Sequence, residues 1–283
     1  MGAQKIAAIV MLVSLMLAAG MEINREHLMA ALKNVVLLAR ALLANFIIVP
    51  VIGYIVVRLF HVEGFVAIGI LLMAIAAGVP FLVRAAGRQP GGSLGFAAAL
   101  AFILPALSIV TIPLTALLVL PSDFEARVPF VQLIVSLVGI QLVPLLIGLL
   151  VADRAPALAA RLQRPLVLVF AVAVLALLII IGPELYKDVI AVYGSHGMLA
   201  ALAIVLLSLV SGWLLGGPEA EYRRTLSIAT ALRNIGTAAV IATASFPNTL
   251  VAPTVLSYFL IQFIVTVVFR VYLHRTAAHP VAS

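Results

Sequence analysis

The residues of this sequence best suited to chemistry lie in one apolar stretch, residues 227–244, which reads SIATALRNIGTAAVIATA. Near its middle it carries Arg233 and Asn234, followed by Gly236. A guanidinium inside a bilayer is costly unless it meets a partner, water or a ligand. The remaining residues are mostly Ala, Thr, Ile and Gly, which let helices approach closely. The stretch therefore predicts an interrupted helix that lines a polar site within a membrane.

The composition indicates a single polytopic membrane domain over residues 1–283. Hydrophobic residues make up 65% of the chain and charged residues 10%, whereas soluble domains carry about 25% charged residues. There is no Cys, which excludes disulfides, thiol catalysis and Cys-based metal sites. The net charge is +7, and the basic residues are spread singly over the predicted loops. This pattern favours contact with anionic lipid headgroups over nucleic acid.

Nine segments are apolar and long enough to cross a bilayer, which takes about 20 residues of helix. They are residues 5–22, 36–60, 64–83, 94–120, 130–151, 165–183, 197–217, 225–246 and 250–272. Because the runs are continuous rather than alternating, we predict an all-α membrane protein and not a barrel. Residues 1–22 also have the pattern of a signal peptide, which stays an alternative to a first span. Residues 24–40 mix charge with Leu and Val and predict an interfacial lead-in.

The loops carry an asymmetric charge that predicts the orientation. One side holds twelve of the 17 Lys and Arg residues, and the other side holds four: Lys5, Arg58, Arg127 and Lys187. The side richer in Lys and Arg is expected to be cytoplasmic. We therefore expect a multi-pass protein of the inner (plasma) membrane, with the N-terminus outside and the C-terminus inside.

Two of the nine segments are interrupted, near residues 64–90 and 225–246. In the first, Gly78 and Pro80 break the apolar run, because proline lacks a backbone donor and disfavours helix at the preceding residue. The two segments lie five spans apart. Paired broken helices in corresponding halves mark the binding site of inverted-repeat transporters. The alternative is a simple kink at Pro80 and an Arg233 satisfied within a helix bundle.

Four motifs then occur in order. Residues 14–21 are similar to an "mGl" helix end, residues 45–50 (NFIIVP) to "QFxxMP", residues 69–80 to the helix before "CPGG", and residues 232–253 to "GMQNSGLA…FP…AP". On these motifs the chain resembles the bile acid:sodium symporter family over essentially its whole length. The resemblance implies a core domain and a panel domain with inverted repeats and two crossed broken helices. It also implies carriage of an organic anion, coupled to sodium in the best-known members.

The sequence departs from the family at the sodium ligands. The family's Glu in the second broken helix falls on Ala229, and a nearby Gln falls on Arg233. The Ser-Asn pair after the first break falls on Ala85-Ala86, and the Gln of "QFxxMP" on Asn45. Neither broken segment contains Asp or Glu, although hard cations prefer oxygen ligands that include carboxylates. We therefore expect no metal and no cofactor, and transport without sodium.

Arg233 allows three interpretations. Its charge replaces the sodium ion, or its planar fork binds the substrate's carboxylate or sulfonate, or it snorkels to the surface or pairs with a backbone carbonyl. Arg84 lies about 30 Å along a helix that starts at Gly64. It is a loop arginine at the cytoplasmic edge unless the break leaves it deeper.

The other candidate substrate- or ion-binding residues are uncharged. The amides either line the site or bond across a helix interface, and the hydroxyls often bond their own helix backbone. These candidates are Asn45, Pro80, Ser108, Thr111, Thr230 and Asn234.

These observations predict a secondary transporter that moves a small or amphipathic organic anion by alternating access. The expected partners are that anion and the lipid bilayer, without nucleic acid, and the oligomeric state is open, with a homodimer as one option. Two alternatives are an auxin-efflux-type carrier and a membrane sensor or scaffold of the same fold that does not transport. No enzyme signature such as HExxH, a P-loop or GxSxG occurs, so no catalytic residue is predicted.

Overall fold

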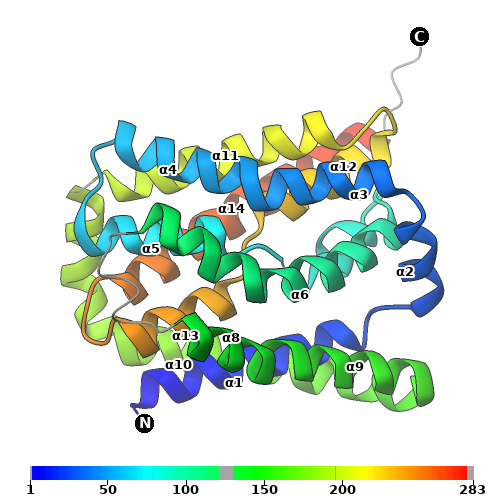
Figure 1. The fold of residues 1–283 in the computed structure, drawn as a ribbon, viewed down its shortest axis with the longest axis horizontal. Coiled ribbons are helices and arrows are strands. Elements are labelled where there is room, and N and C mark those ends of the chain that lie inside the picture. Colours follow the sequence, from blue (N-terminus) through cyan, green and yellow to red (C-terminus); the bar gives the residue numbers. More distant parts are fainter. Residues whose placement is uncertain (1, 79, 121–129, 195, 279–283) are drawn as a thin grey trace.

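The computed structural model describes residues 2–78, 80–120, 130–194 and 196–278, and within these ranges the regular structure is entirely helical. Figure 1 shows the helices running side by side along the long axis of the molecule. The α-helices are α1 (Ala3–Gly20), α2 (Arg25–Leu32), α3 (Val35–Leu43), α4 (Val49–Leu59), α5 (Gly64–Ile75), α6 (Leu94–Val119), α8 (Phe130–Leu137), α9 (Val143–Arg154), α10 (Pro156–Gly194), α11 (Gly197–Leu215), α12 (Ala220–Ala231), α13 (Ile235–Ser245) and α14 (Val251–Ala278). Three π-helical turns interrupt them: η1 (Ala44–Ile48), η2 (Val83–Gly87) and η3 (Val138–Leu142).

The predicted all-α membrane protein is confirmed, with one change in the count of spans. Eight helical stretches in the described part of the chain are long and apolar enough to cross a membrane. The ninth predicted span, residues 64–83, is a helix of only 12 residues, α5, followed by a break and η2. The predicted interfacial lead-in at residues 24–40 divides into α2, which Asn24 caps through Oδ1, and the first part of α3.

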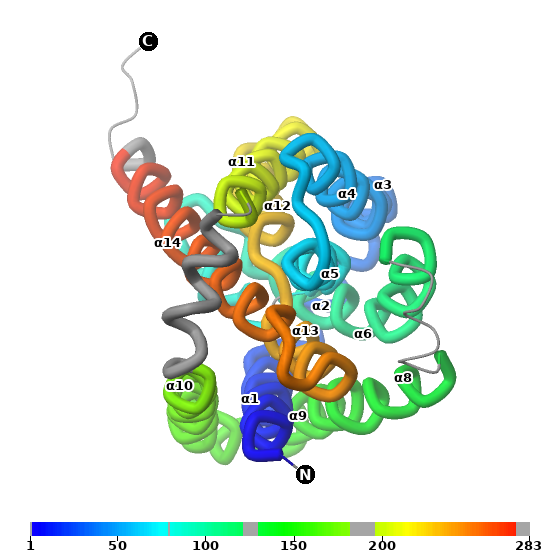
Figure 2. Tube along the Cα trace, turned by 90° about the vertical axis from the view of Figure 1, so that its left-hand side faces the viewer, coloured from blue at the N-terminus to red at the C-terminus, as the bar shows by residue number. Residues whose placement is uncertain are grey.

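The helices form two layers, visible in both views. Helices α1, α8, α9 and α10 lie together at the bottom of Figures 1 and 2, and the other long helices lie above them. In the lower layer, α1 and α9 touch at glycines: a Cβ built on Gly20 would lie 2.2 Å from the carbonyl oxygen of Leu145. We call the layer of α1, α8, α9 and α10 the panel and the layer of the other helices the core.

Two of the π-helical turns are each followed by a proline in the next helix, and both carry a buried amide. Asn45 lies in η1 ahead of Pro50, and Gln141 lies in η3 ahead of Pro144. The shift to π-type bonding and the missing proline N–H together leave backbone carbonyls without an intrahelical donor. These turns therefore present polar atoms inside an apolar bundle.

The two predicted breaks meet inside the core. Helix α5 ends at Ile75, and Gly78 then has a φ of 96°, a conformation that favours glycine. Any side chain there would also collide with α6, since a Cβ would lie 2.5 Å from the nitrogen of Pro105. Helices α12 and α13 are separated by residues 232–234, and the Asn234 N–H donates to the Ala76 carbonyl at 2.9 Å. The broken helices therefore cross in contact with each other.

Candidate transport site

Arg233 lies at the crossing of the broken helices, and protein oxygens accept hydrogen bonds from both of its terminal nitrogens. Its Nε is buried without a hydrogen-bond partner in the described structure. Its side chain is 1% exposed. Nη1 donates to Asn45 Oδ1 at 2.9 Å, and Nη2 donates to the carbonyl oxygens of Asn45 at 3.0 Å and Ala74 at 2.9 Å. The arginine therefore does not snorkel to a surface. Its guanidinium joins three segments of the core.

The carbonyls that receive Arg233 are free for reasons visible in the local sequence. In η1 the Val49 N–H donates to Ala44, and the next donor along the chain would be residue 50, which is proline. The Asn45 carbonyl is therefore left without a backbone donor. Ala74 belongs to the last turn of α5, where carbonyls lack intrahelical partners. That end of a helix also carries partial negative charge, which stabilises a cation.

The side chain of Asn45 is oriented by its own helix. Its Nδ2 donates to the Ala41 carbonyl at 3.0 Å, which turns Oδ1 toward Arg233. The backbone of Arg233 is fixed as well, because its N–H donates to Gln262 Oε1 at 2.9 Å and its carbonyl accepts from Gln262 Nε2 at 3.2 Å. Arg233 is thus anchored at both its backbone and its side chain.

A second polar network links the second break to the panel through Gln141. Gln141 Nε2 donates to the Pro105 carbonyl at 2.6 Å and to Ser108 Oγ at 2.8 Å. Its Oε1 accepts from Thr237 Oγ1 and, at 3.5 Å, from Asn234 Nδ2. Asn234 Oδ1 in turn accepts from the Thr237 N–H at 3.2 Å, which caps α13. The network connects the panel segment η3 to α6 and α13 of the core.

Two of the predicted hydroxyl residues stand apart from this centre. The hydroxyl of Thr230 donates to the Ser208 carbonyl at 2.7 Å and joins α12 to α11. Thr111 is buried at its Oγ1, which has no hydrogen-bond partner in the described structure. Ser108 is closer, because it lies within the Gln141 network and donates to the Pro105 carbonyl at 2.7 Å. The predicted residues therefore divide into a centre around Arg233 and Asn234 and a periphery.

A cavity of about 290 Å³ lies between the panel and the core, close to the first break. Pro80, Phe81 and Arg84 line it from the core, beside residues of α1, α10 and α14. Arg84 sits on η2 and is 35% exposed. Its side chain is therefore partly buried by protein, and its depth in the membrane stays a prediction. Arg233 does not line this cavity.

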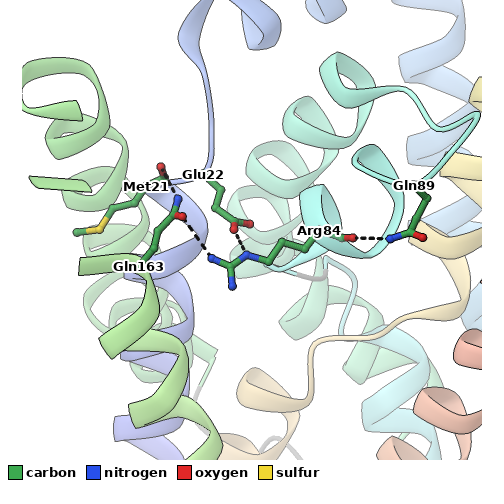
Figure 3. A network of polar contacts seen from close by, with 5 residues as sticks. All are labelled: Met21, Glu22, Arg84, Gln89 and Gln163. Atoms are coloured by element: carbon green, nitrogen blue, oxygen red, sulfur yellow. Dashed lines mark hydrogen bonds and ion pairs between the residues drawn. The ribbon is translucent and has the colours of Figure 1, made fainter. Parts of the chain in front are cut away.

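Arg84 contacts the panel directly, as Figure 3 shows. Its Nε donates to Glu22 Oε1, and its Nη2 lies 3.4 Å from Gln163 Oε1. Gln163 Nε2 donates to the Met21 carbonyl at 3.1 Å, which ties α10 to the end of α1. Burial raises the pKa of the Glu22 carboxyl, and the charge and hydrogen bond of Arg84 oppose that rise.

Several residues of these networks are not among the predicted site residues, including Glu22, Gln262 and Thr237. Glu22 lies two residues beyond the end of α1 and is the last residue of the predicted span 5–22, so nothing in the sequence sets it apart from the polar end of a helix. Gln262 was detectable, because it is a lone amide in the middle of an apolar span. Thr237 lies three residues after Asn234, which is the spacing of a helix cap.

The comparison with protein families gives a match over most of the chain. The model of the sodium bile acid symporter family matches residues 9–192. This range includes the first break, Asn45 and Gln141, and it ends before the second break. No curated protein matches the chain.

Proposed function

The chain belongs to the sodium bile acid symporter family, a family of membrane transporters, and on that premise we propose that it carries a small or amphipathic organic anion without sodium. The observation that carries the proposal is the buried Arg233 guanidinium, with its three bonds to the oxygens of Asn45 and Ala74. A fixed positive charge at the crossing of the broken helices takes the place of a bound cation.

A sodium ion does not fit the residues at this crossing. The position that resembles the family's carboxylate ligand is Ala229, whose buried methyl group offers no oxygen. The oxygens of Asn45 and Ala74, which face the crossing, already accept hydrogen bonds from Arg233. A second cation beside the guanidinium would meet like charge in a medium of low dielectric constant. The proposed transport therefore does not involve sodium.

We propose that Arg233 acts in the framework and that the substrate occupies the cavity between the layers. Arg233 is 1% exposed and its fork is committed to the protein. The cavity instead has apolar walls, including Phe81 and Phe170, and carries Glu22, Arg84 and Arg270. Two arginines and one carboxylate leave a net positive site that suits a monoanion with an apolar body.

Alternating access would come from rocking of the panel against the core around this cavity. The orientation deduced from the loop charges supports this arrangement. It places the end of α1, the start of α10 and Arg84 on the cytoplasmic side of the plasma membrane. In Figure 1, α1 begins at one end of the bundle and α14 finishes at the other.

The test is transport by purified protein in proteoliposomes. Uptake of radiolabelled cholate, phenylacetate and indole-3-acetate would be compared in sodium and in choline buffers. We expect at least one anion to enter at equal rates in both, and entry that requires sodium would overturn the proposal. Failure of all three anions, with cholate representing the family's named substrate class, would also count against it.

A gain-of-function variant sharpens the test. Ala229→Glu combined with Arg233→Gln restores the carboxylate and removes the internal cation. We expect the melting temperature of this double variant to rise with sodium concentration, while that of the wild type stays constant. Arg161→Gln, an exposed arginine of α10, is the matched control. A sodium-dependent melting temperature in the wild type would show that Arg233 leaves room for the ion.

A further inference from the structure

The cavity between panel and core has a mostly apolar lining that includes a few charged residues. Its apolar wall comes from both layers, with Leu15, Ala18 and Phe170 on the panel side and Phe81 and Phe259 on the core side. The remaining lining includes Glu22, Arg84 and Arg270. The Nε of Arg270 is buried and has no hydrogen-bond partner in the described structure. Such a lining selects a ligand with an apolar body and one anionic group.

Two of these charged residues already form an ion pair that joins the two layers. Glu22 belongs to the end of α1 in the panel, and Arg84 belongs to η2 in the core. The carboxylate is 2% exposed and the arginine side chain 35% exposed. Arg84 therefore still faces open space, although an internal carboxylate occupies its Nε. A free carboxylate or sulfonate entering the cavity would present the same chemistry to this guanidinium as Glu22 does.

We propose that Arg84 binds the anionic group of the substrate and that Glu22 is an internal anion that occupies Arg84 while the carrier is empty. This inference rests on the proposed function and assigns the substrate class at that site, a monoanionic carboxylate or sulfonate. The substrate and Glu22 compete for one guanidinium. Because the pair joins the layers, a substrate that displaces Glu22 also removes one of the polar contacts between the panel and the core.

The competition has a consequence for the mode of transport. An empty carrier is held by the Glu22–Arg84 contact and reorients slowly, whereas a loaded carrier is free of it. Ligands shift a conformational equilibrium only through such a difference in contacts between states. The carrier should therefore exchange one anion for another faster than it moves an anion in one direction.

The charge that Glu22 and Arg84 create in the cavity can be tested without knowing the substrate. The chain has no native Cys, so charged thiol reagents would modify only a cysteine introduced beside the pair. Ala18 lies in the last turn of α1 and lines the same cavity as Glu22. An Ala18→Cys variant would be labelled with 2-sulfonatoethyl methanethiosulfonate, an anion, and with 2-(trimethylammonium)ethyl methanethiosulfonate, a cation. The ratio of the two rates reports the charge that an entering anion meets.

We expect opposite effects from the two partners. In the Ala18→Cys background, Glu22→Gln should raise the ratio of anionic to cationic labelling at least about fivefold, and Arg84→Gln should lower it by a similar factor. Arg58→Gln, far from this cavity and lining another one, is the control and should leave the ratio unchanged. Gel filtration and the melting temperature verify that each variant is folded.

A second measurement distinguishes competition between the substrate and Glu22 for Arg84 from a Glu22–Arg84 pair with only a structural role. In the same Ala18→Cys background, cholate should slow anionic labelling of the introduced thiol at lower concentration in Glu22→Gln than in the parent, and should lose this protection in Arg84→Gln. Equal loss of protection in both variants, or an introduced thiol that neither reagent modifies, would overturn the proposal. Charge selectivity that persists when no anion is transported would instead overturn the proposed function alone.

Discussion

Replacing Arg233 by Gln tests whether the buried guanidinium holds the crossing together. The side chain makes three hydrogen bonds, to Asn45 Oδ1 and to the carbonyls of Asn45 and Ala74. The glutamine Nε2 stands where arginine has Nε and does not reach as far as the two terminal nitrogens. It can therefore serve at most one of the three acceptors, and at least two buried acceptors lose their partners. Each costs about 1–3 kcal/mol, or about 2–6 kcal/mol in total.

Release of a buried charge offsets part of this loss. We expect a net destabilisation of about 3 kcal/mol. For a chain of this size each kcal/mol corresponds to about 2–4 °C in the melting temperature. Arg233→Gln should therefore melt about 6–12 °C below the wild type.

The assay is thermal unfolding in detergent, in choline buffer so that no sodium effect enters. Arg161→Gln removes the same charge from an exposed position of α10 and should shift the melting temperature by less than about 1 °C. A melting temperature of Arg233→Gln equal to that of the wild type would refute the reasoning. It would mean that the three acceptors find other donors or that the guanidinium is as costly to bury as it is useful.

Three further changes probe the same framework by thermal unfolding. Gly78→Ala should lower the melting temperature by more than about 3 °C, because a φ of 96° strains any side chain; Gly139→Ala, where a Cβ meets nothing within 4 Å, should not. Gln141→Leu should lower it by about 5 °C, since the Thr237 hydroxyl loses its acceptor, and an unchanged value would contradict the network. Burial raises the pKa of Glu22 above its ordinary 4.5, so the folded protein holds the Glu22 proton more tightly than the unfolded chain does. The stabilisation from this protonated carboxyl is fully present below pH 4.5 and is lost as the pH rises through the raised pKa. In a pH series of melting temperatures, Glu22→Gln should decline less steeply than the wild type. Equal slopes for the two proteins would contradict a raised pKa of Glu22.

The number and positions of the membrane crossings followed largely from the sequence, because apolar runs of about 20 residues leave a helix across the bilayer as the stable solution. The two breaks followed as well. Pro80 and Gly78 disrupt helical bonding locally, and the polar pair at 233–234 cannot continue a plain apolar span without partners. The alternation of loop charge indicates the orientation, which remains a prediction.

The partners of the polar groups were decided only by the tertiary structure. Arg233 meets Asn45, 188 residues away, and Ala74, 159 residues away, and Glu22 meets Arg84 across 62 residues. Hydropathy and local propensity determine where helices begin and end, but they carry no information about which helix faces which. The packing of the panel against the core places these groups together, and for that reason a glutamate at the end of a predicted span became part of the candidate site.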